Sequence, residues 1–163
     1  MKLVSSCLVG LCATWRAKDS TREKLEEMLA SGQLIPVCPE QMGGLATPRP
    51  PAEIVGGDGD AVLDGRAKVM SREGVDVTEN FIRGAEEVLK LAQRVRPDEI
   101  VMKEKSPSCG VRYIYDGSFK GHLVPGSGVA TALLRRHGFI VVSDEEFLHG
   151  IASPPKDDPT VYA

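Results

Sequence analysis

The chain has no apolar run that approaches the roughly 20 residues needed for a membrane-spanning helix. Its start, Met1–Cys7, is too short in its apolar part for a secretory signal peptide. It also has no excess of basic residues: 20 Lys and Arg stand against 23 Asp and Glu, and the net charge of -3 provides no broad positive surface for a nucleic-acid backbone. We therefore expect a cytoplasmic protein that binds neither membranes nor polynucleotides.

Closely paired cysteines are also absent. The four cysteines include no CxxC pair, whereas structural zinc usually takes four ligands in closely spaced pairs, so a closed zinc site is the weaker interpretation. Cytosolic thiols are kept reduced, which disfavours structural disulfides. The thiols are therefore candidates for metal binding or catalysis. A redox pair of Cys7 and Cys12 is a further interpretation, which the missing CxxC spacing weakens.

What is present suits one globular α/β domain. The 163 residues suffice for a hydrophobic core, and the hydrophobic share of 42% and the charged share of 26% are typical of such domains. Strand-like segments alternate with helical ones, which predicts a single Rossmann-like domain, with a mostly parallel sheet and flanking helices. We place this domain at residues 1–150. Residues 151–163, with three prolines and few apolar groups, are expected to form a disordered tail.

Hydrophobic periodicity and capping signals locate the elements. Strands are predicted at Leu3–Ser6, Leu34–Val37, Glu99–Lys103 and Phe139–Val142. Helices are predicted from a cap at Asp19 or Ser20 to Gly32, at Thr78–Val95, at Val129–His137, and for a final turn after Ser143. Residues 41–66, rich in Gly and Pro, are predicted to be an irregular loop that walls the active site. A short strand or hairpin is expected at Ala67–Met70, and another small hairpin around Tyr113.

Three of the strand-like segments each lead into a cysteine: Cys7, Cys38 and Cys109. The carboxyl ends of parallel strands share one edge of a sheet, so these thiols converge if the three strands are neighbours. A single cysteine is often a small buried hydrophobe, but three at strand exits favour metal ligands. Three thiolates without a fourth suit an iron–sulfur cubane in which one iron lacks a protein ligand. Cys12 lies mid-loop, and we interpret it as incidental or as a neighbour of the ligands, with ligation by Cys12 itself as the lesser alternative.

Polar residues accompany two of these cysteines. Glu40 lies two residues after the second of them and could move protons or position water near the open iron, or could be a solvated loop carboxylate. Ser106 and Ser108 precede the third and could donate hydrogen bonds to substrate or cluster sulfur, or could bond only local backbone. Lys103 would make the cleft positive, although strand-edge lysines are most often solvated.

Longer stretches carry a family resemblance. They are Ser6–Gly10, Pro36–Gly44, Thr47–Glu53, Asp76–Glu86 and Lys103–Gly110, the last of which reads Lys-Glu-Lys-Ser-Pro-Ser-Cys-Gly. With these motifs the chain resembles the thiouracil desulfidases, small bacterial and archaeal proteins long catalogued as a domain of unknown function, and the similarity runs from about Leu3 to Phe147. One segment departs from the family pattern: Ala13–Lys18 stands where an Arg-Tyr-Asp-Gly-like stretch is common.

The resemblance implies a Rossmann-like domain that holds a [4Fe-4S] cluster through three cysteines, which here are Cys7, Cys38 and Cys109. One iron is then free to take the sulfur of a thiolated pyrimidine such as 2-thiouracil. The implied reaction is a non-redox hydrolysis that gives uracil and hydrogen sulfide. We expect a monomer or a small homo-oligomer.

The resemblance also assigns roles to side chains around the cluster. It implies catalytic roles for Glu40 and Ser106, with Ser108 competing for the role of the serine. Substrate binding is expected at Ser108, Lys103 and Arg49. The alternative function is a non-catalytic iron–sulfur or metal-binding module for storage, transfer or sensing.

Overall fold

The structure is a computed structural model that describes residues 1–150 and 153–163. Its strands are β1 (Lys2–Ser5), β2 (Leu34–Val37), β3 (Ala52–Val55), β4 (Lys68–Ser71), β5 (Glu99–Met102), β6 (Tyr113–Tyr115), β7 (Leu123–Pro125) and β8 (Val141–Ser143). Its helices are the 3-10 helix η1 (Ser6–Val9) and the α-helices α1 (Glu23–Ala30), α2 (Pro39–Met42), α3 (Gly59–Leu63), α4 (Thr78–Val95), α5 (Val129–Arg136) and α6 (Asp144–His149). Among the described residues, no helix combines the length and the apolar character that crossing a membrane requires.

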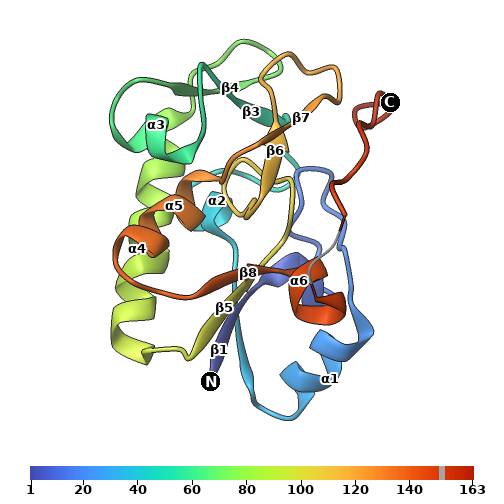
Figure 1. Cartoon of the computed structure of the whole chain (residues 1–163), viewed down its shortest axis with the longest axis vertical. Helices are drawn as coiled ribbons and strands as arrows, with labels where there is room; N and C mark the ends of the chain where they lie inside the picture. Colours follow the sequence, from blue (N-terminus) through green and yellow to red (C-terminus); the bar gives the residue numbers. More distant parts are fainter. Residues whose placement is uncertain (151–152) are drawn as a thin grey trace.

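A four-stranded parallel sheet with the order β2-β1-β5-β8 forms the centre of the molecule (Figure 1). β1 pairs with β2 from Lys2 opposite Leu34 to Ser5 opposite Val37, and it pairs with β5 on its other side. Two antiparallel ribbons, β3-β4 and β6-β7, stand above the carboxyl ends of these strands in the view of Figure 1. The three strands that lead to cysteines are therefore neighbours, and their ends meet at one edge of the sheet.

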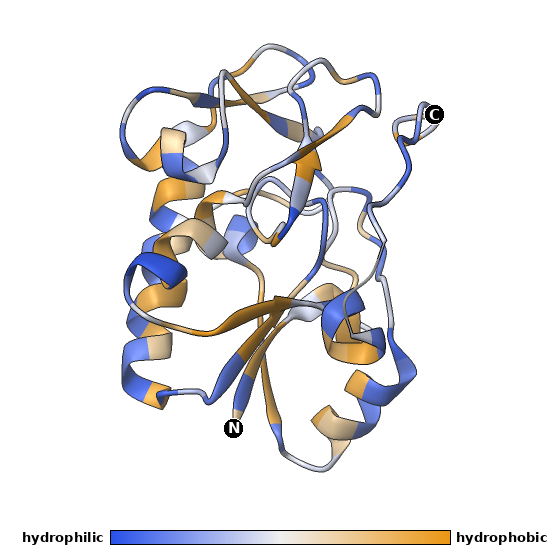
Figure 2. Ribbon diagram, viewed as in Figure 1, coloured by the Kyte–Doolittle hydropathy of each residue, from blue (hydrophilic) through white to orange (hydrophobic). Residues whose placement is uncertain are grey.

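Helices cover both faces of the sheet. In β5, Ile100 and Met102 belong to the larger core, which includes α4 and α5, whereas Val101 belongs to the smaller core, which includes α1 and η1. Leu3 and Val4 divide in the same way in β1. Strands that are buried on both faces need apolar residues throughout, as the orange central strands in Figure 2 show. The predicted α/β class, with a parallel sheet and flanking helices, is confirmed.

The helix predicted at Thr78–Val95 is confirmed as α4, because its apolar residues recur at helical spacing and lie buried on one face. The first helix begins later than predicted, at Glu23 instead of after a cap at Asp19 or Ser20. The backbone N–H of Ser20 donates to the carbonyl oxygen of Cys7 at 2.7 Å, and that of Arg22 donates to Leu8 at 2.9 Å. These amides hold the chain against η1, so the helix starts only after them.

The prediction of an irregular loop over residues 41–66 is wrong in part. This range contains the end of α2, all of β3 and all of α3. β3 has only four residues, and β4, the strand with which it pairs, comes after α3 in the sequence. Four residues are too few to show the alternation that marks a strand. α3 is a short helix capped by Asp58, whose Oδ1 accepts the N–H of Ala61 at 3.0 Å. The short strand expected near Ala67–Met70 is confirmed as β4, and the hairpin around Tyr113 as β6-β7.

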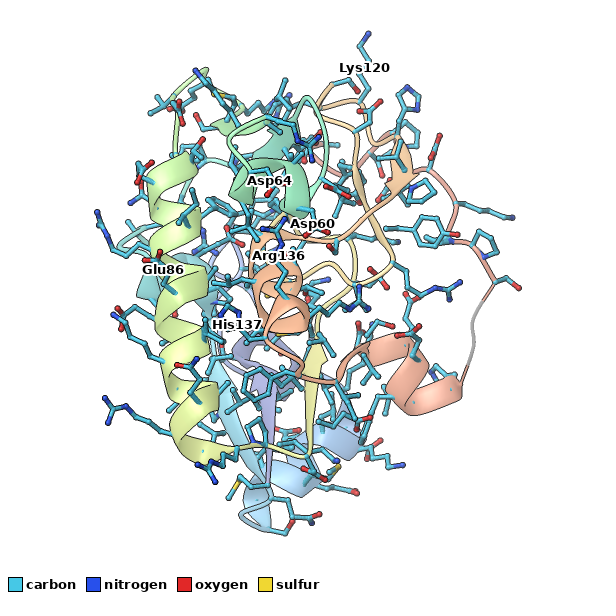
Figure 3. The ribbon with its side chains drawn as sticks, turned by 60° about the vertical axis from the view of Figure 1, so that its left-hand side comes forward. Asp60, Asp64, Glu86, Lys120, Arg136 and His137 are labelled. Carbon is cyan, nitrogen blue, oxygen red and sulfur yellow. The ribbon has the colours of Figure 1, made fainter. Side chains whose placement is uncertain are left out.

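Two ion pairs join α3 to α5. Arg136 Nε lies 2.9 Å from Asp60 Oδ1, and its Nη2 lies 3.0 Å from Asp64 Oδ1 (Figure 3). All three side chains are exposed, and exposed ion pairs contribute about 0–1 kcal/mol each. The burial of Ala61 and Val62 therefore holds α3 more firmly than these charges do.

The described part of the C-terminal segment, for which composition predicts a disordered tail, makes hydrogen bonds to the β6-β7 hairpin. Residues 151–152 lie outside the described part of the chain, but residues 153–163 return to the body of the protein. Asp157 Oδ1 accepts the N–H of Leu123 at 2.9 Å, and the N–H of Asp158 donates to the carbonyl oxygen of Gly121 at 2.9 Å. These hydrogen bonds attach residues 157–158 to the β6-β7 hairpin. Composition did not indicate them, because every partner is distant in sequence.

α2 rests on α4 through direct backbone contact at two glycines, and this contact generates a prediction. A Cβ on Gly84 would lie 1.9 Å from the carbonyl oxygen of Pro39, and a Cβ on Gly43 would lie 2.0 Å from that of Asn80. We expect Gly84→Ala to lower the free energy of unfolding by about 1–3 kcal/mol, since overpacking outweighs the higher helix propensity of alanine.

Urea denaturation measures this effect. Glu86→Ala, on the exposed face of the same helix (Figure 3), is the matched control and should change stability little. Equal stability of the two variants would contradict the proposed contact.

Candidate metal centre

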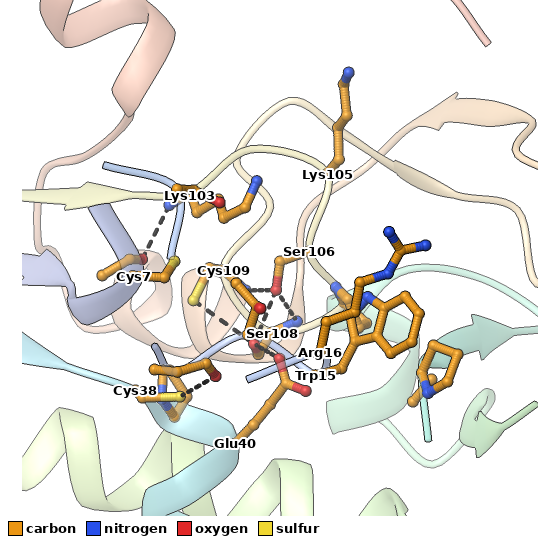
Figure 4. A pocket seen from close by; sticks show the side chains of 18 of the residues that line it. Cys7, Trp15, Arg16, Cys38, Glu40, Lys103, Lys105, Ser106, Ser108 and Cys109 are labelled. Carbon is orange, nitrogen blue, oxygen red and sulfur yellow. Dashed lines mark hydrogen bonds between the residues drawn. The ribbon is translucent and has the colours of Figure 1, made fainter. Parts of the chain in front are cut away.

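Three loops bring their cysteines to one cavity at the carboxyl edge of the sheet. Cys7 lies in η1 directly after β1, Cys38 directly follows β2, and Cys109 lies in the loop after β5. All three line a cavity of about 370 Å³, as Figure 4 shows. The predicted convergence of these side chains is thus present. Cys12 is exposed and does not line this cavity.

The three thiols are buried or half-buried, and burial changes their acidity. Burial raises the pKa of Cys7 to about 11 and that of Cys109 to about 12, and it raises the pKa of Cys38 in the same direction. Their mutual repulsion as thiolates adds to the shift, while the Lys103 ammonium opposes it at Cys7. The thiols therefore keep their protons at neutral pH unless a metal replaces them.

The residues around the cavity fit a cluster of several metal ions. Among the described residues, no three Cys, His, Asp or Glu side chains are arranged to hold a single metal ion. Thiols spread around a cavity are the donors that iron–sulfur clusters use, and a cluster core spans more space than one ion. Ser6, beside Cys7, has a buried hydroxyl with no hydrogen-bond partner, and it lines the same cavity. An acceptor such as a cluster sulfide would satisfy it.

Two hydrogen-bond partners, one at each carboxylate oxygen, hold Glu40 at the cavity. Pro39 begins the short helix α2, which places Glu40 in the first turn after Cys38. Its Oε1 accepts a hydrogen bond from Arg49 Nε at 3.1 Å, and its Oε2 accepts one from Ser108 Oγ at 2.9 Å. Arg49 also donates to the carbonyl oxygen of Ala13 at 2.9 Å, and only 6% of its side chain is exposed. The structure therefore places Arg49 against Glu40.

Ser106 and Ser108 form one chain with Glu40. Their hydroxyl oxygens lie 3.0 Å apart, and Ser106 Oγ also accepts the backbone N–H groups of Ser108 and Cys109. Because Ser108 donates to Glu40, it accepts the proton of Ser106 in the same arrangement. Ser108 is buried and Ser106 is half-buried (Figure 4). The hydroxyl of Ser106 is thus the accessible end of a chain whose inner end is a carboxylate.

Sequence reasoning missed Glu104, which shapes the loop between β5 and β6. Glu104 is 5% exposed, and its Oε1 accepts the N–H groups of Val111, Arg112 and Tyr113 at 2.8 to 3.1 Å. Its own N–H donates to Asp144 Oδ1 at 3.0 Å. In the sequence Glu104 stands between two lysines, a pattern typical of solvated charges, so no local signal marked it as buried.

Aromatic residues form another part of the cavity lining. Trp15, Tyr115 and Tyr162 line it together with Lys103 and Lys105. The sequence drew attention to neither tyrosine, because each is brought to the cavity by a segment without a motif of its own.

Comparison with known proteins agrees with this geometry. A family model described as 2-thiouracil desulfurase matches residues 3–146. An uncharacterized protein of Bacillus subtilis (strain 168), YbbK, is 42% identical over 146 residues, which cover 90% of this chain and 97% of YbbK. A solved structure titled [4Fe-4S]-dependent thiouracil desulfidase TudS superposes with a TM-score of 0.78 at 39% identity, covering 90% of this chain and 91% of that one. The chain therefore belongs to the 2-thiouracil desulfurase family.

Proposed function

We propose that this chain is a [4Fe-4S]-dependent enzyme that hydrolyses the carbon–sulfur bond of thiolated pyrimidines. The reaction with 2-thiouracil consumes one water and yields uracil and hydrogen sulfide, so no electrons are gained or lost. The observation that carries the proposal is the meeting of three buried thiols with the Glu40–Ser108–Ser106 chain in one cavity of a family member.

Cys7, Cys38 and Cys109 would hold the cluster by three of its irons. When bound, the cluster supplies an iron without a protein ligand, a Lewis acid that polarises the thiocarbonyl group through its sulfur. The protein contributes the walls of the cavity, which leave the cysteine ligands buried or half-buried.

Glu40 acts as the base that orients a water molecule toward the carbon of the thiocarbonyl group and takes its proton. Arg49 fixes one carboxylate oxygen, so the carboxylate keeps its direction while it accepts the proton at the other. Ser106 contacts the substrate from the accessible end of the chain, and Ser108 transmits a proton between Ser106 and Glu40. Lys103 makes the cavity more positive, which favours thiolates and bound anions.

The same chain of side chains favours an enzyme over a module for storage, transfer or sensing. A site that only holds a cluster gains nothing from a carboxylate linked through two hydroxyl groups to the open cavity. We further propose a single Rossmann-like domain that acts in the cytoplasm as a monomer or small homo-oligomer, without a polynucleotide. The parallel sheet, the free cysteines and the net charge of -3 support these statements.

Removing one ligand tests the cluster. After anaerobic reconstitution the protein should be brown and should contain about four irons per chain. We expect Cys38→Ala to lose the visible absorption band and most of the iron, because two thiolates cannot hold the core. Cys12→Ala, a cysteine outside the cavity, should keep both. Full iron content in the Cys38→Ala variant would remove this residue from the ligand set.

Removing the base tests the chemistry. Glu40→Gln should keep the iron and the colour, while sulfide release from 2-thiouracil should fall by about 10²–10⁴-fold, the usual effect of losing a general base. Lys90→Ala, which changes an exposed residue far from the cavity lining on α4, serves as the control and should retain full turnover. Sulfide release by Glu40→Gln at the control rate would exclude the role given to Glu40.

A double-variant experiment tests whether the two serines act as one chain. Ser106→Ala and Ser108→Ala should each slow sulfide release, and the double variant should be little slower than the slower single variant, since residues that act as a unit are not additive. Additive losses in kcat would show independent roles and would contradict the relay.

A further inference from the structure

The outer wall of the cavity is aromatic and comes in part from the C-terminal segment, residues 153–163. The chain has one Trp and three Tyr, and three of these four residues line the cavity: Trp15, Tyr115 and Tyr162. The ring centroid of Tyr162 lies 5.8 Å from that of Trp15 and 6.3 Å from that of Tyr115. Tyr162 also lies beyond residues 3–146, the part that the family model matches. This wall therefore includes a residue that the family match does not describe.

Tyr162 is fixed by a buried carboxylate. Its hydroxyl donates to Oε2 of Glu53, a residue that is 1% exposed. Oε1 of the same carboxylate accepts the N–H groups of Gly117 and Phe119 at 2.9 and 3.1 Å. Burial and the adjacent Glu53 raise the pKa of Tyr162 far above its usual value, which keeps the hydroxyl protonated as a donor. A buried carboxylate that loses a donor is destabilised, so Glu53 favours the position of Tyr162 at the cavity.

Backbone contacts hold the same segment from two other sides. Arg16 Nη2 donates to the carbonyl oxygen of Val161 at 2.7 Å, and Arg72 Nη1 donates to that of Tyr162 at 3.3 Å. The guanidinium of Arg16 also lies 4.6 Å from the ring centroid of Trp15, so one side chain links both parts of the aromatic wall (Figure 4). The wall is therefore built from the loop after η1, the hairpin β6-β7 and the C-terminal segment together.

We propose that Tyr162 is a specificity-determining residue whose ring, with that of Trp15, forms the wall against which the flat pyrimidine ring of the substrate packs. This inference rests on the proposed function. A planar heteroaromatic ring gains dispersion and quadrupole interactions against Trp and Tyr rings. In Figure 4 the Glu40–Ser108–Ser106 chain lies between Trp15 and the three cysteines, so packing on the aromatic wall directs the reacting carbon toward that chain and the cysteines.

Steady-state kinetics of the cluster-loaded full chain test the role of the ring. Tyr162→Ala should raise the KM for 2-thiouracil about tenfold, in line with the loss of one base–aromatic contact, and should change kcat much less. Tyr162→Phe keeps the ring and loses only the hydroxyl, so it should show a smaller rise in KM. Tyr113→Phe changes a tyrosine outside the cavity lining and should behave as wild type.

Iron content should be equal in all of these proteins, because the ligands lie elsewhere. An unchanged KM in a fully loaded Tyr162→Ala variant overturns the inference. If that variant fails to load iron, Tyr162→Leu, which keeps apolar bulk but has no aromatic ring, takes its place, and a KM equal to that of wild type then overturns the inference.

The fluorescence of Trp15, the single tryptophan of the chain, gives a readout that needs no turnover. Acrylamide should quench this emission more strongly in Tyr162→Ala than in wild type, because the neighbouring ring is gone. Titration with 2-thiouracil should quench Trp15 in wild type at lower concentrations than in the variant. Identical behaviour of the two proteins overturns the inference. If binding of 2-thiouracil depends on Tyr162 but the cluster-loaded wild type releases no sulfide, the proposed function is refuted and the aromatic wall remains supported.

Discussion

The parallel pairing of β1 with β2 on one side and with β5 on the other is the constraint on which the rest of the structure depends. Three chain segments far apart in sequence end side by side because of it, and each delivers a cysteine within seven residues of its strand end. The register also matters. A shift of one residue would turn every side chain of a strand to the opposite face and exchange the two cores.

Two buried carboxylates, Glu53 and Glu104, shape the backbone near the cavity, and backbone N–H groups donate hydrogen bonds to both. Burying a polar group without hydrogen-bond partners costs free energy, yet Glu53 and Glu104 lie almost fully inside the protein. Glu104 accepts the N–H groups of Val111, Arg112 and Tyr113 at the entry to β6, and Glu53 accepts those of Gly117 and Phe119 in the connection from β6 to β7. For these segments the carboxylates supply the hydrogen-bond acceptors that backbone carbonyl groups supply in a helix or a sheet. They give irregular backbone at the cavity a defined shape.

The thiols and the Glu40 carboxylate share one cavity but differ in their surroundings. Cys7 and Cys109 are desolvated, which favours their neutral form until a metal displaces the protons. Glu40 lies at the same cavity, where Arg49 donates to one carboxylate oxygen and Ser108 to the other. The close contact of α2 with α4 at Gly43 and Gly84 fixes the short helix that carries Glu40.

The sequence by itself determined the α/β class, the long helix Thr78–Val95, and the three strands that end near cysteines. These features are local: apolar periodicity, caps and short motifs act within a few residues of each other. Only the tertiary structure decided that Ser108 lies between Ser106 and Glu40, that Glu104 is buried, that β3 is a strand, and that Tyr162 returns to the cavity. Each of those outcomes rests on a partner far away along the chain. Burial and hydrogen bonding between distant segments are decided by the packing of the whole chain, which no short stretch of sequence records.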